Sequence, residues 1–224
     1  MKLAIVGYGK MGRLIGQLAP EYGFTLHAAI DEKDDISTAK GADAAIEFSV
    51  PSAVVGNVEK LAVLGVPTVV GTTGWLEHLG EVKKIVKAHN TALVWSPNFS
   101  IGVNVFFRVI QEASKLLANE AEYGAWAWEI HHDTKKDAPS GTLLKLVEEM
   151  RSAGYKRHID VSSNRAGRHP GTHEIGFDSV ADSITLRHTA RNREGFARGA
   201  LKAAQWIPGK KGVFAFEEVL FDKR

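Results

Sequence analysis

Short apolar runs alternate with helix-like spacing through the first hundred residues of the chain. The apolar run at 2–6 predicts a strand, and Met11, Leu14, Ile15 and Leu18 follow at the three- and four-residue spacing of an amphipathic helix. Further strands are predicted over 25–30, 42–48, 66–70 and 91–95, and helices over 54–64 and 79–86. This alternation predicts an α/β domain with a parallel sheet, right-handed crossovers and helices on both faces.

The pattern changes after Pro97. A helix over 104–117 precedes an alternating strand at 125–132. Later helices are predicted over 143–150 and 195–206, and later strands over 159–161, 173–178, 183–188 and 212–220. Strands separated by loops predict an α+β region with a mostly antiparallel sheet. Trp126 and Trp128 are two residues apart and share one sheet face, which we interpret as core or subunit contact.

The first strand runs into a glycine-rich turn, GYGKMG, that opens the first helix. Gly7, Gly9 and Gly12 have the G-x-G-x-x-G spacing of a dinucleotide-binding turn, in which the helix N-terminus faces a pyrophosphate. An ordinary strand-to-helix turn remains the alternative. Asp31 ends the second strand, where a carboxylate can accept hydrogen bonds from the ribose hydroxyls. Lys10 and Lys33 are near enough in sequence to offset its charge, so a strict preference for NAD does not follow.

Three more turns follow predicted strands at the same edge of the sheet: FSVPS, GTTG at 71–74 and SPNFS. Ligands of parallel sheets bind at the carboxyl ends of the strands, so we expect these turns to line one crevice with the glycine turn. The alternative is that Gly, Ser and Thr are common in such turns for structural reasons.

The segment EIHHDTKKDAPSGT, at 129–142, contains the closest grouping of candidate functional side chains in the sequence. His131 and His132 are followed by Lys135 and Lys136 and by a Ser-Gly-Thr turn that opens a helix. Imidazoles, ammonium groups and free backbone N–H groups together suit a small anionic substrate. A solvated loop with incidental histidines is the alternative.

Composition narrows the class of protein. The 224 residues are 44% hydrophobic, which is enough for a sizeable core. A formal charge of +2 creates no strong electrostatic field that would attract nucleic acid or a membrane surface. The absence of Cys excludes disulfides, thiolate zinc sites and a cysteine nucleophile. No metal-ligand spacing is evident, and there is no signal-peptide or membrane-spanning pattern. We therefore expect a soluble, cytoplasmic protein.

Taken together, these motifs resemble the dihydrodipicolinate reductase family almost from end to end. The likeness rests on GYGKMG, GTTG, SPNFSIGVN at 96–104, EIHHDTKKDAPSGT, GTHEIGF at 171–177 and HTARNREGFARGA at 188–200. The resemblance implies a Rossmann-type dinucleotide-binding domain, 1–101 plus 195–224, closed by the C-terminal helix. It also implies an inserted substrate-binding and tetramerisation domain at 102–194, a homotetramer, and NADH or NADPH as cofactor.

The resemblance also implies roles for individual residues. His131 matches the proton donor, with Lys135 as a second catalytic candidate that also matches a substrate contact. The substrate-binding candidates are His132, Ser140, Gly141 and Thr142. The cofactor-binding candidates are Gly7, Gly9, Lys10, Met11, Gly12, Asp31, Lys33, Phe48, Gly71, Thr72, Thr73, Ser96, Asn98 and Phe99.

The chain departs from the family pattern at several positions. Its glycine turn is one residue shorter than the commoner form, and Glu32 stands where many members carry an Arg for the 2′-phosphate of NADPH. Asp133 and Thr134 replace a more basic pair seen in some members.

The implied reaction is the NAD(P)H-dependent reduction of 4-hydroxy-tetrahydrodipicolinate, a cyclic imine with two carboxylates, in the diaminopimelate and lysine pathway. Domain closure would bring the nicotinamide to the substrate, while His131, or Lys135 acting through it, supplies a proton. Two alternatives are a related amino-acid or imine dehydrogenase and a non-catalytic nucleotide-binding module.

Overall fold

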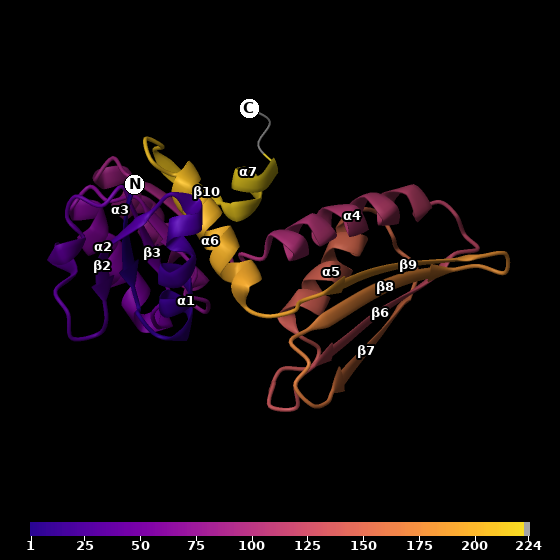
Figure 1. The fold of residues 1–224 in the computed structure, drawn as a ribbon. Helices are drawn as coiled ribbons and strands as arrows, with labels where there is room; N and C mark the ends of the chain where they lie inside the picture. The colour runs from indigo at the N-terminus through magenta and orange to yellow at the C-terminus, as the bar shows by residue number, and fades with distance from the viewer. Residues whose placement is uncertain (222–224) are drawn as a thin grey trace. The chain divides into compact units, whose positions relative to one another are not determined.

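The computed structural model describes residues 1–221 and divides into two compact units (Figure 1). Unit 1 is Met1–Ile101 together with the segment from Glu194, and unit 2 is Gly102–Arg193. The boundary at which the chain returns from unit 2 to unit 1 lies at Glu194, where helix α6 begins, one residue before the predicted boundary at 195. No helix in the described part of the chain is both long and apolar enough to cross a membrane.

Unit 1 is built on a six-stranded parallel sheet in the order β10-β5-β4-β3-β1-β2. The strands are β1 (Lys2–Val6), β2 (Thr25–Ile30), β3 (Ala44–Glu47), β4 (Thr68–Val70), β5 (Ala92–Trp95) and β10 (Gly212–Ala215). The order reverses beside β1, because the chain moves outward first to β2 and then, from β3 onward, in the opposite direction. Ligands of open α/β sheets bind in the crevice at such a point.

Helices cover both faces of this sheet, as the alternation of elements predicts. They are α1 (Lys10–Leu18), α2 (Val54–Val63), α3 (Leu79–Ala88), α6 (Glu194–Trp206) and α7 (Phe216–Phe221), with short 3-10 turns at Ala19–Tyr22, Ile36–Ala39, Pro51–Ala53 and Leu76–His78. Leu3 and Ile5 of β1 pack with α1 and α6, whereas Ala4 and Val6 pack on the opposite face with Leu61 of α2. Alternate residues of one buried strand therefore serve two cores.

The prediction of a single strand over 212–220 is wrong in its second half. The strand ends at Ala215, and α7 begins at Phe216. Phe216 and Val219 are buried at helical spacing, and the Glu218 carboxylate accepts a hydrogen bond from the backbone N–H of Ala215 at 2.7 Å. Burial at that spacing and a capped N-terminus favour a helix over the alternating pattern of a strand.

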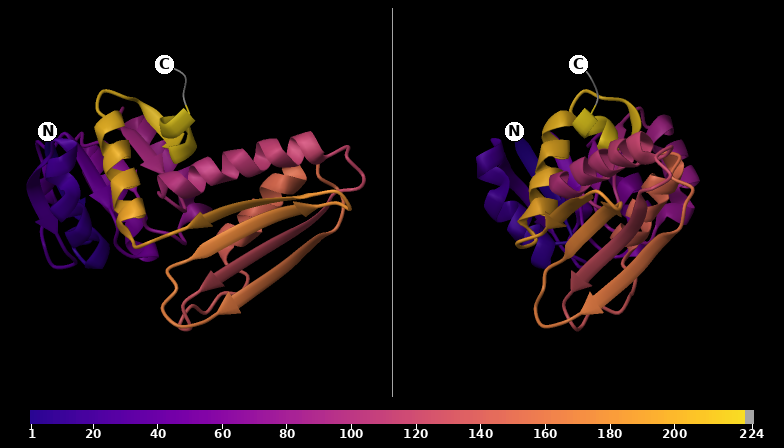
Figure 2. Two further views of the ribbon diagram at one scale, coloured as in Figure 1. Left: turned by 45° about the vertical axis from the view of Figure 1, so that its right-hand side comes forward. Right: turned by 90° about the vertical axis from the view of Figure 1, so that its right-hand side faces the viewer.

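Unit 2 is a four-stranded sheet with two helices on one face (Figure 2). The strand order is β7-β6-β8-β9, comprising β7 (Ile159–Arg165), β6 (Gly124–His131), β8 (Thr172–Asp178) and β9 (Ser183–Thr189). The pair β6–β7 is parallel and the other two pairs are antiparallel, so the expected mostly antiparallel sheet is confirmed. The helices are α4 (Ile101–Leu117) and α5 (Gly141–Ser152).

The two faces of strand β6 have different environments. Ala127 packs in the core with α4 and α5, so Glu129 and His131, at two-residue intervals, lie on this helix-covered face. Trp126 and Trp128 lie on the other face, which we call the outer face. There the Trp126 ring lies against Gly176 of β8, in the space that a Cβ would need.

Candidate active site

The glycine turn after β1 has the backbone that a dinucleotide-binding turn requires. Gly7 has a φ of +88°, and a Cβ there would collide with the carbonyl group of Phe48. A Cβ on Gly12 would collide with the carbonyl oxygen of Gly7, so this glycine allows α1 to approach the strand. Gly9 is the N-cap of α1, and a Cβ there would meet nothing within 4 Å. The space above Gly9 is therefore open to a phosphate group.

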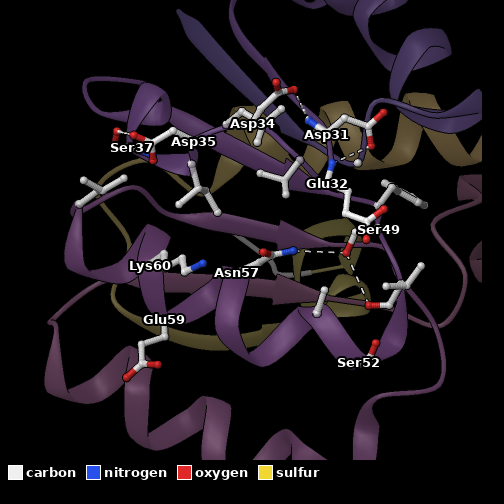
Figure 3. Close-up of a pocket in the computed structure, with 18 of the residues that line it drawn as sticks. Asp31, Glu32, Asp34, Asp35, Ser37, Ser49, Ser52, Asn57, Glu59 and Lys60 are labelled. Carbon is white, nitrogen blue, oxygen red and sulfur yellow. Dashed lines mark hydrogen bonds between the residues drawn. The ribbon is translucent and has the colours of Figure 1, made fainter.

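A cavity of about 1020 Å³ extends from this turn along the carboxyl ends of β1, β2 and β3 (Figure 3). Its lining includes Gly7, Gly9, Asp31 and Phe48 of the residues that sequence predicts. Asp31 follows β2 directly, and its carboxylate accepts a hydrogen bond from the backbone N–H of Glu32 at 3.1 Å. Its position suits the ribose hydroxyls of a dinucleotide.

A second cavity, of about 450 Å³, lies next to the turn on the side of β4. It brings together seven predicted residues, which are Gly9, Lys10, Met11, Phe48, Gly71, Thr72 and Thr73. Of these, Gly9 and Phe48 also line the larger cavity. Gly71 leaves room for Phe48, because a Cβ there would stand 2.0 Å from the tip of the Phe48 ring.

Sequence reasoning missed a buried network beneath these turns. Glu47, the last residue of β3, is fully buried and accepts hydrogen bonds from Ser49 Oγ, from Thr72 Oγ1 at 2.6 Å and from Asn57 Nδ2 at 3.2 Å. Thr72 Oγ1 in turn accepts from the backbone N–H of Ser49 at 2.8 Å. Burial raises the pKa of Glu47, and these hydrogen bonds oppose the rise. The network ties the turn after β3 to the turn after β4.

The remaining cofactor candidates do not line either cavity. Lys33 is exposed beyond Asp31. Ser96 Oγ accepts from the backbone N–H of Asn98 at 3.1 Å, which closes a tight turn after β5. Phe99 is 2% exposed and packs against Phe216 with a ring separation of 4.8 Å, so it is a core residue in this structure.

The crevice of unit 1 fits a nicotinamide dinucleotide. It offers an open helix N-terminus for the pyrophosphate, an acid at the end of β2 for the ribose and an adjoining smaller cavity at the end of β4. The first two features form the dinucleotide-binding fingerprint.

Unit 2 contains a buried cluster around His131, the last residue of β6. Its Nδ1 lies 2.9 Å from Oε2 of Glu129, although neither atom makes a hydrogen bond of ordinary geometry. The Nδ1 atom is buried and 11% of the side chain is exposed, so Nε2 is the nitrogen that can reach a ligand. Gly171 leaves room for it, because a Cβ there would stand 2.9 Å from Nε2.

Arg165 and His173 complete the cluster from the strands on either side. Arg165 of β7 donates to Glu129 Oε1 at 2.9 Å, and His173 Nε2 of β8 lies 3.5 Å from Oε2. Burial, with the nearby His131, lowers the pKa of His173 to about 4, so this ring is neutral near pH 7. Burial also lowers the pKa of His131, and Glu129 opposes that change.

Lys135 lies in the loop between this cluster and α5. Its Nζ lies 2.7 Å from the carboxylate of Asp137. Hydrogen bonding by Lys135 lowers the pKa of Asp137, and the backbone N–H of Gly141 acts in the same direction. Lys135 and the start of α5 therefore accommodate a carboxylate, here one of the protein itself.

The backbone N–H and the side chain of Ser140 both make contacts within the protein. Its backbone N–H donates to Glu129 Oε1 at 2.7 Å, and its Oγ accepts from the N–H of Leu143 at 3.2 Å, so both groups are used within the protein. Ser140 is thus a buried N-cap, whereas Gly141 is exposed and Thr142 is half-buried. His132 is half-buried, and its Nδ1 lies 2.7 Å from Thr134 Oγ1.

Glu129, His131 and His173 could in principle bind a divalent metal, because one ligand atom from each lies within 4.8 Å of the others. The Arg165 guanidinium already lies on the same carboxylate, which disfavours a further cation. We therefore interpret the cluster as a site of proton transfer and not of metal binding.

The alternating pattern of β6 contains a signal for Glu129. Glu129 and His131 are two residues apart in an alternating strand, the spacing that places Trp126 and Trp128 together. Arg165 and His173 have no comparable signal, since strand register alone sets His131 opposite Arg165 and Glu129 opposite His173.

Comparison with known proteins places this chain in a family. Residues 1–99 match the family described as dihydrodipicolinate reductase, N-terminus, and residues 102–220 match dihydrodipicolinate reductase, C-terminus. A protein of Christiangramia forsetii named 4-hydroxy-tetrahydrodipicolinate reductase is 34% identical over 99% of this chain and 98% of its own length. One of the same name from Methanoregula boonei is 34% identical over 98% and 97%.

Solved structures share the fold. A dipicolinate-bound dihydrodipicolinate reductase from Paenisporosarcina sp. TG-14 superposes with a TM-score of 0.85 at 22% identity, covering 98% of this chain and 99% of that one. An amine dehydrogenase from Mycobacterium smegmatis superposes with a TM-score of 0.66 at 9% identity, covering 97% and 95%. The two family matches and these relatives show that the chain belongs to the dihydrodipicolinate reductase family.

Proposed function

We propose that this protein reduces 4-hydroxy-tetrahydrodipicolinate, a cyclic imine with two carboxylates, with a reduced nicotinamide cofactor in the diaminopimelate and lysine pathway. The observation that carries the proposal is His131, whose Nδ1 faces a buried carboxylate while its Nε2 lies on the accessible side, next to a carboxylate-binding turn. Family membership and the dinucleotide-type crevice of unit 1 support it.

The loop before α5 binds and orients the substrate in this proposal. One substrate carboxylate takes the place that Asp137 holds, with Lys135 Nζ and the N–H groups of Gly141 and Thr142 as donors. Charge-assisted hydrogen bonds to a fixed backbone turn hold the ring in one orientation. His132, beside this loop, is assigned a second polar contact.

His131 supplies the proton that the reduction consumes. The donor is Nε2, on the accessible side of the ring. Lys135 is the second candidate donor, acting directly or through His131. The bound cofactor would be held by the glycine turn, Asp31 and the residues of the smaller cavity, and it supplies the hydride.

The decisive experiment is a coupled assay. The preceding synthase forms the substrate from aspartate semialdehyde and pyruvate, and consumption of reduced nicotinamide is followed after addition of this protein. Turnover that depends on the synthase supports the proposal. Turnover with amino acids or other imines but not with this substrate would indicate a related dehydrogenase, and cofactor binding without any turnover would indicate a nucleotide-binding module.

We further propose that NADH is preferred over NADPH. The lining of the larger cavity is rich in acidic residues, and Lys60 is the one cation among the described residues that line it (Figure 3). The acids are Asp31, Glu32, Asp34, Asp35 and Glu59. A 2′-phosphate would add about two negative charges beside them, at a cost in binding.

The ratio of kcat/KM for the two cofactors tests this preference, with an expected advantage for NADH of about 10-fold or more. Combining Asp31→Ser with Glu32→Arg should move the ratio toward NADPH, because an acid is lost and a guanidinium is gained. Glu81→Arg on α3, outside the cavity, is the control. Equal use of both cofactors by the unaltered protein would contradict the preference.

We also infer that the outer face of the unit 2 sheet joins copies of the chain into the expected homotetramer. Trp126 and Trp128 are only partly buried there. The helices of unit 2 lie on the opposite face of its sheet (Figure 2). Light scattering of the purified protein gives its mass. Trp128→Glu should dissociate the assembly, whereas Val180→Glu, at a fully exposed hairpin position, should not.

A further inference from the structure

Glu129 is a buried acid to which the proposed reaction assigns no step. Its side chain is fully inaccessible, although an ionised carboxylate is costly to bury without partners. The partners of its two oxygens differ. Oε1 accepts hydrogen bonds from the N–H of Ser140 at 2.7 Å and from Arg165 at 2.9 Å, whereas Oε2 faces the imidazoles of His131 and His173.

The donors on Oε1 keep this carboxylate ionised. Burial alone would raise its pKa, but the hydrogen bonds from Ser140 and Arg165 outweigh burial and bring the pKa to about 2. Oε2 makes no hydrogen bond of ordinary geometry, so its negative charge is directed at the ring nitrogens 2.9 and 3.5 Å away. Of the two rings, His131 is the closer and the more accessible.

Charged groups face His131 from every element around it. Glu129 lies on the same strand, Arg165 and His173 lie on the flanking strands, and Lys135 and Asp137 lie in the following loop. Burial, Lys135 and Arg165 all favour the neutral ring, whereas Glu129 favours the imidazolium and Asp137 does so more weakly. Asp137 is 57% exposed and lies where the substrate carboxylate is proposed to bind, so Glu129 is the fixed group that opposes loss of the proton.

We propose that Glu129 is a positioning residue: its Oε2 holds Nδ1 of His131 as the protonated nitrogen, directs Nε2 toward the substrate and sustains the proton-loaded ring. Through Oε1 the same carboxylate fixes the Ser140 end of the carboxylate-binding turn, so donor and turn share one support. This inference rests on the proposed reductase function, in which His131 donates the proton.

The first test needs no turnover. NMR titration of the His131 ring, assigned with His131→Gln, compares the unaltered protein with Glu129→Gln and Glu129→Asp. The midpoint should fall by about one unit or more in Glu129→Gln, because a nearby charge is removed while burial remains. Glu129→Asp keeps the charge and should recover at least half of that shift. If Glu129→Gln does not fold, the titration of Glu129→Asp still tests the proposal.

Turnover gives the second readout. Glu129→Gln should lower kcat about 10-fold or more, with a smaller change in substrate KM. As pH is raised, the kcat of this variant should begin to decline at a lower pH than the kcat of the unaltered protein. Glu149→Gln is the matched control. Glu149 is also buried and paired, with Lys145 at 2.8 Å, but it lies on α5 away from His131.

The possible outcomes distinguish failure of the positioning role of Glu129 from failure of the proposed reductase function. An unchanged His131 midpoint in Glu129→Gln, or an equal shift in Glu149→Gln, would overturn the positioning role. A loss of kcat without movement of the pH profile would indicate a purely structural role and would overturn it as well. A shifted midpoint in a protein that shows no reductase turnover would support the Glu129–His131 relationship and would count only against the proposed function.

Discussion

The carboxylate of Glu129 accepts a hydrogen bond from the backbone N–H of Ser140 at 2.7 Å, across eleven residues of chain. This contact joins the end of strand β6 to the first turn of α5. It also removes one N–H from the anion-binding capacity of that turn. Ser140 is therefore expected to matter for stability more than for substrate binding.

Ser140→Ala tests that expectation. Loss of the N-cap to Leu143 should lower the free energy of unfolding by about 1 kcal/mol. Substrate KM should change less than in Lys135→Ala, which removes a ligand-facing cation. Urea denaturation and steady-state kinetics measure the two effects, with exposed Ser152→Ala as control. Unchanged stability together with a large rise in KM would instead place Ser140 in contact with substrate.

His131→Gln should remove the proton donor while keeping a polar side chain of similar reach. We expect kcat to fall by roughly 100-fold or more, with little change in the dissociation constant of NADH measured by fluorescence. The separation is expected because the cofactor residues belong to unit 1 and His131 to unit 2. A kcat close to that of the unaltered protein would exclude His131 as donor and leave Lys135.

Gly7→Ala and Gly9→Ala form a matched pair in one turn. Gly7 has φ +88°, and a Cβ would collide with the Phe48 carbonyl, so Gly7→Ala should destabilise the protein by about 2 kcal/mol or more. Gly9 has open space around a Cβ, so Gly9→Ala should change stability by less than about 1 kcal/mol.

The same pair separates fold from binding. Gly9→Ala should weaken NADH binding by about 10-fold, because the added methyl group stands where the pyrophosphate approaches. Thermal denaturation and NADH titration of both variants provide the comparison. If Gly9→Ala binds NADH normally, the pyrophosphate does not lie over this turn.

His173 predicts a pH dependence of stability. Burial first, and then His131, lower its pKa from 6.5 to about 4 in the folded protein, so the unfolded chain binds a proton between these values when the folded chain does not. The free energy of unfolding should therefore fall as pH drops from 6.5 toward 4, by at most about 3.4 kcal/mol from this residue.

Replacement by Gln isolates that contribution. His131 and His188, whose pKa values burial also lowers, act in the same direction and remain in His173→Gln. Glu129 has its pKa lowered from 4.5 to about 2, so its contribution is lost as pH falls from 4.5 toward 2, largely below that window. Denaturation at several pH values should give a shallower slope in His173→Gln than in the unaltered protein or in exposed His89→Gln. Equal slopes in all three proteins would contradict the buried neutral state of His173.

Much of this protein is fixed by local sequence. Apolar runs, helical spacing and the glycine turn predicted the parallel sheet and the crevice lined by Gly9 and Asp31, because these features depend on short-range periodicity and backbone freedom. The same local rules failed at 216–221, where Phe216 and Val219 fit either a strand or a helix until burial against the unit 1 core decided between them.

The cluster around His131 was decided by tertiary structure. Sequence identified His131 and Lys135, but only strand register sets Arg165 and His173 around Glu129, from positions more than thirty residues farther along the chain. Only the folded backbone commits the Ser140 N–H to that same carboxylate. Periodicity shows which side chains share a face, whereas the ionisation of a buried group depends on charges and donors brought to it by distant segments.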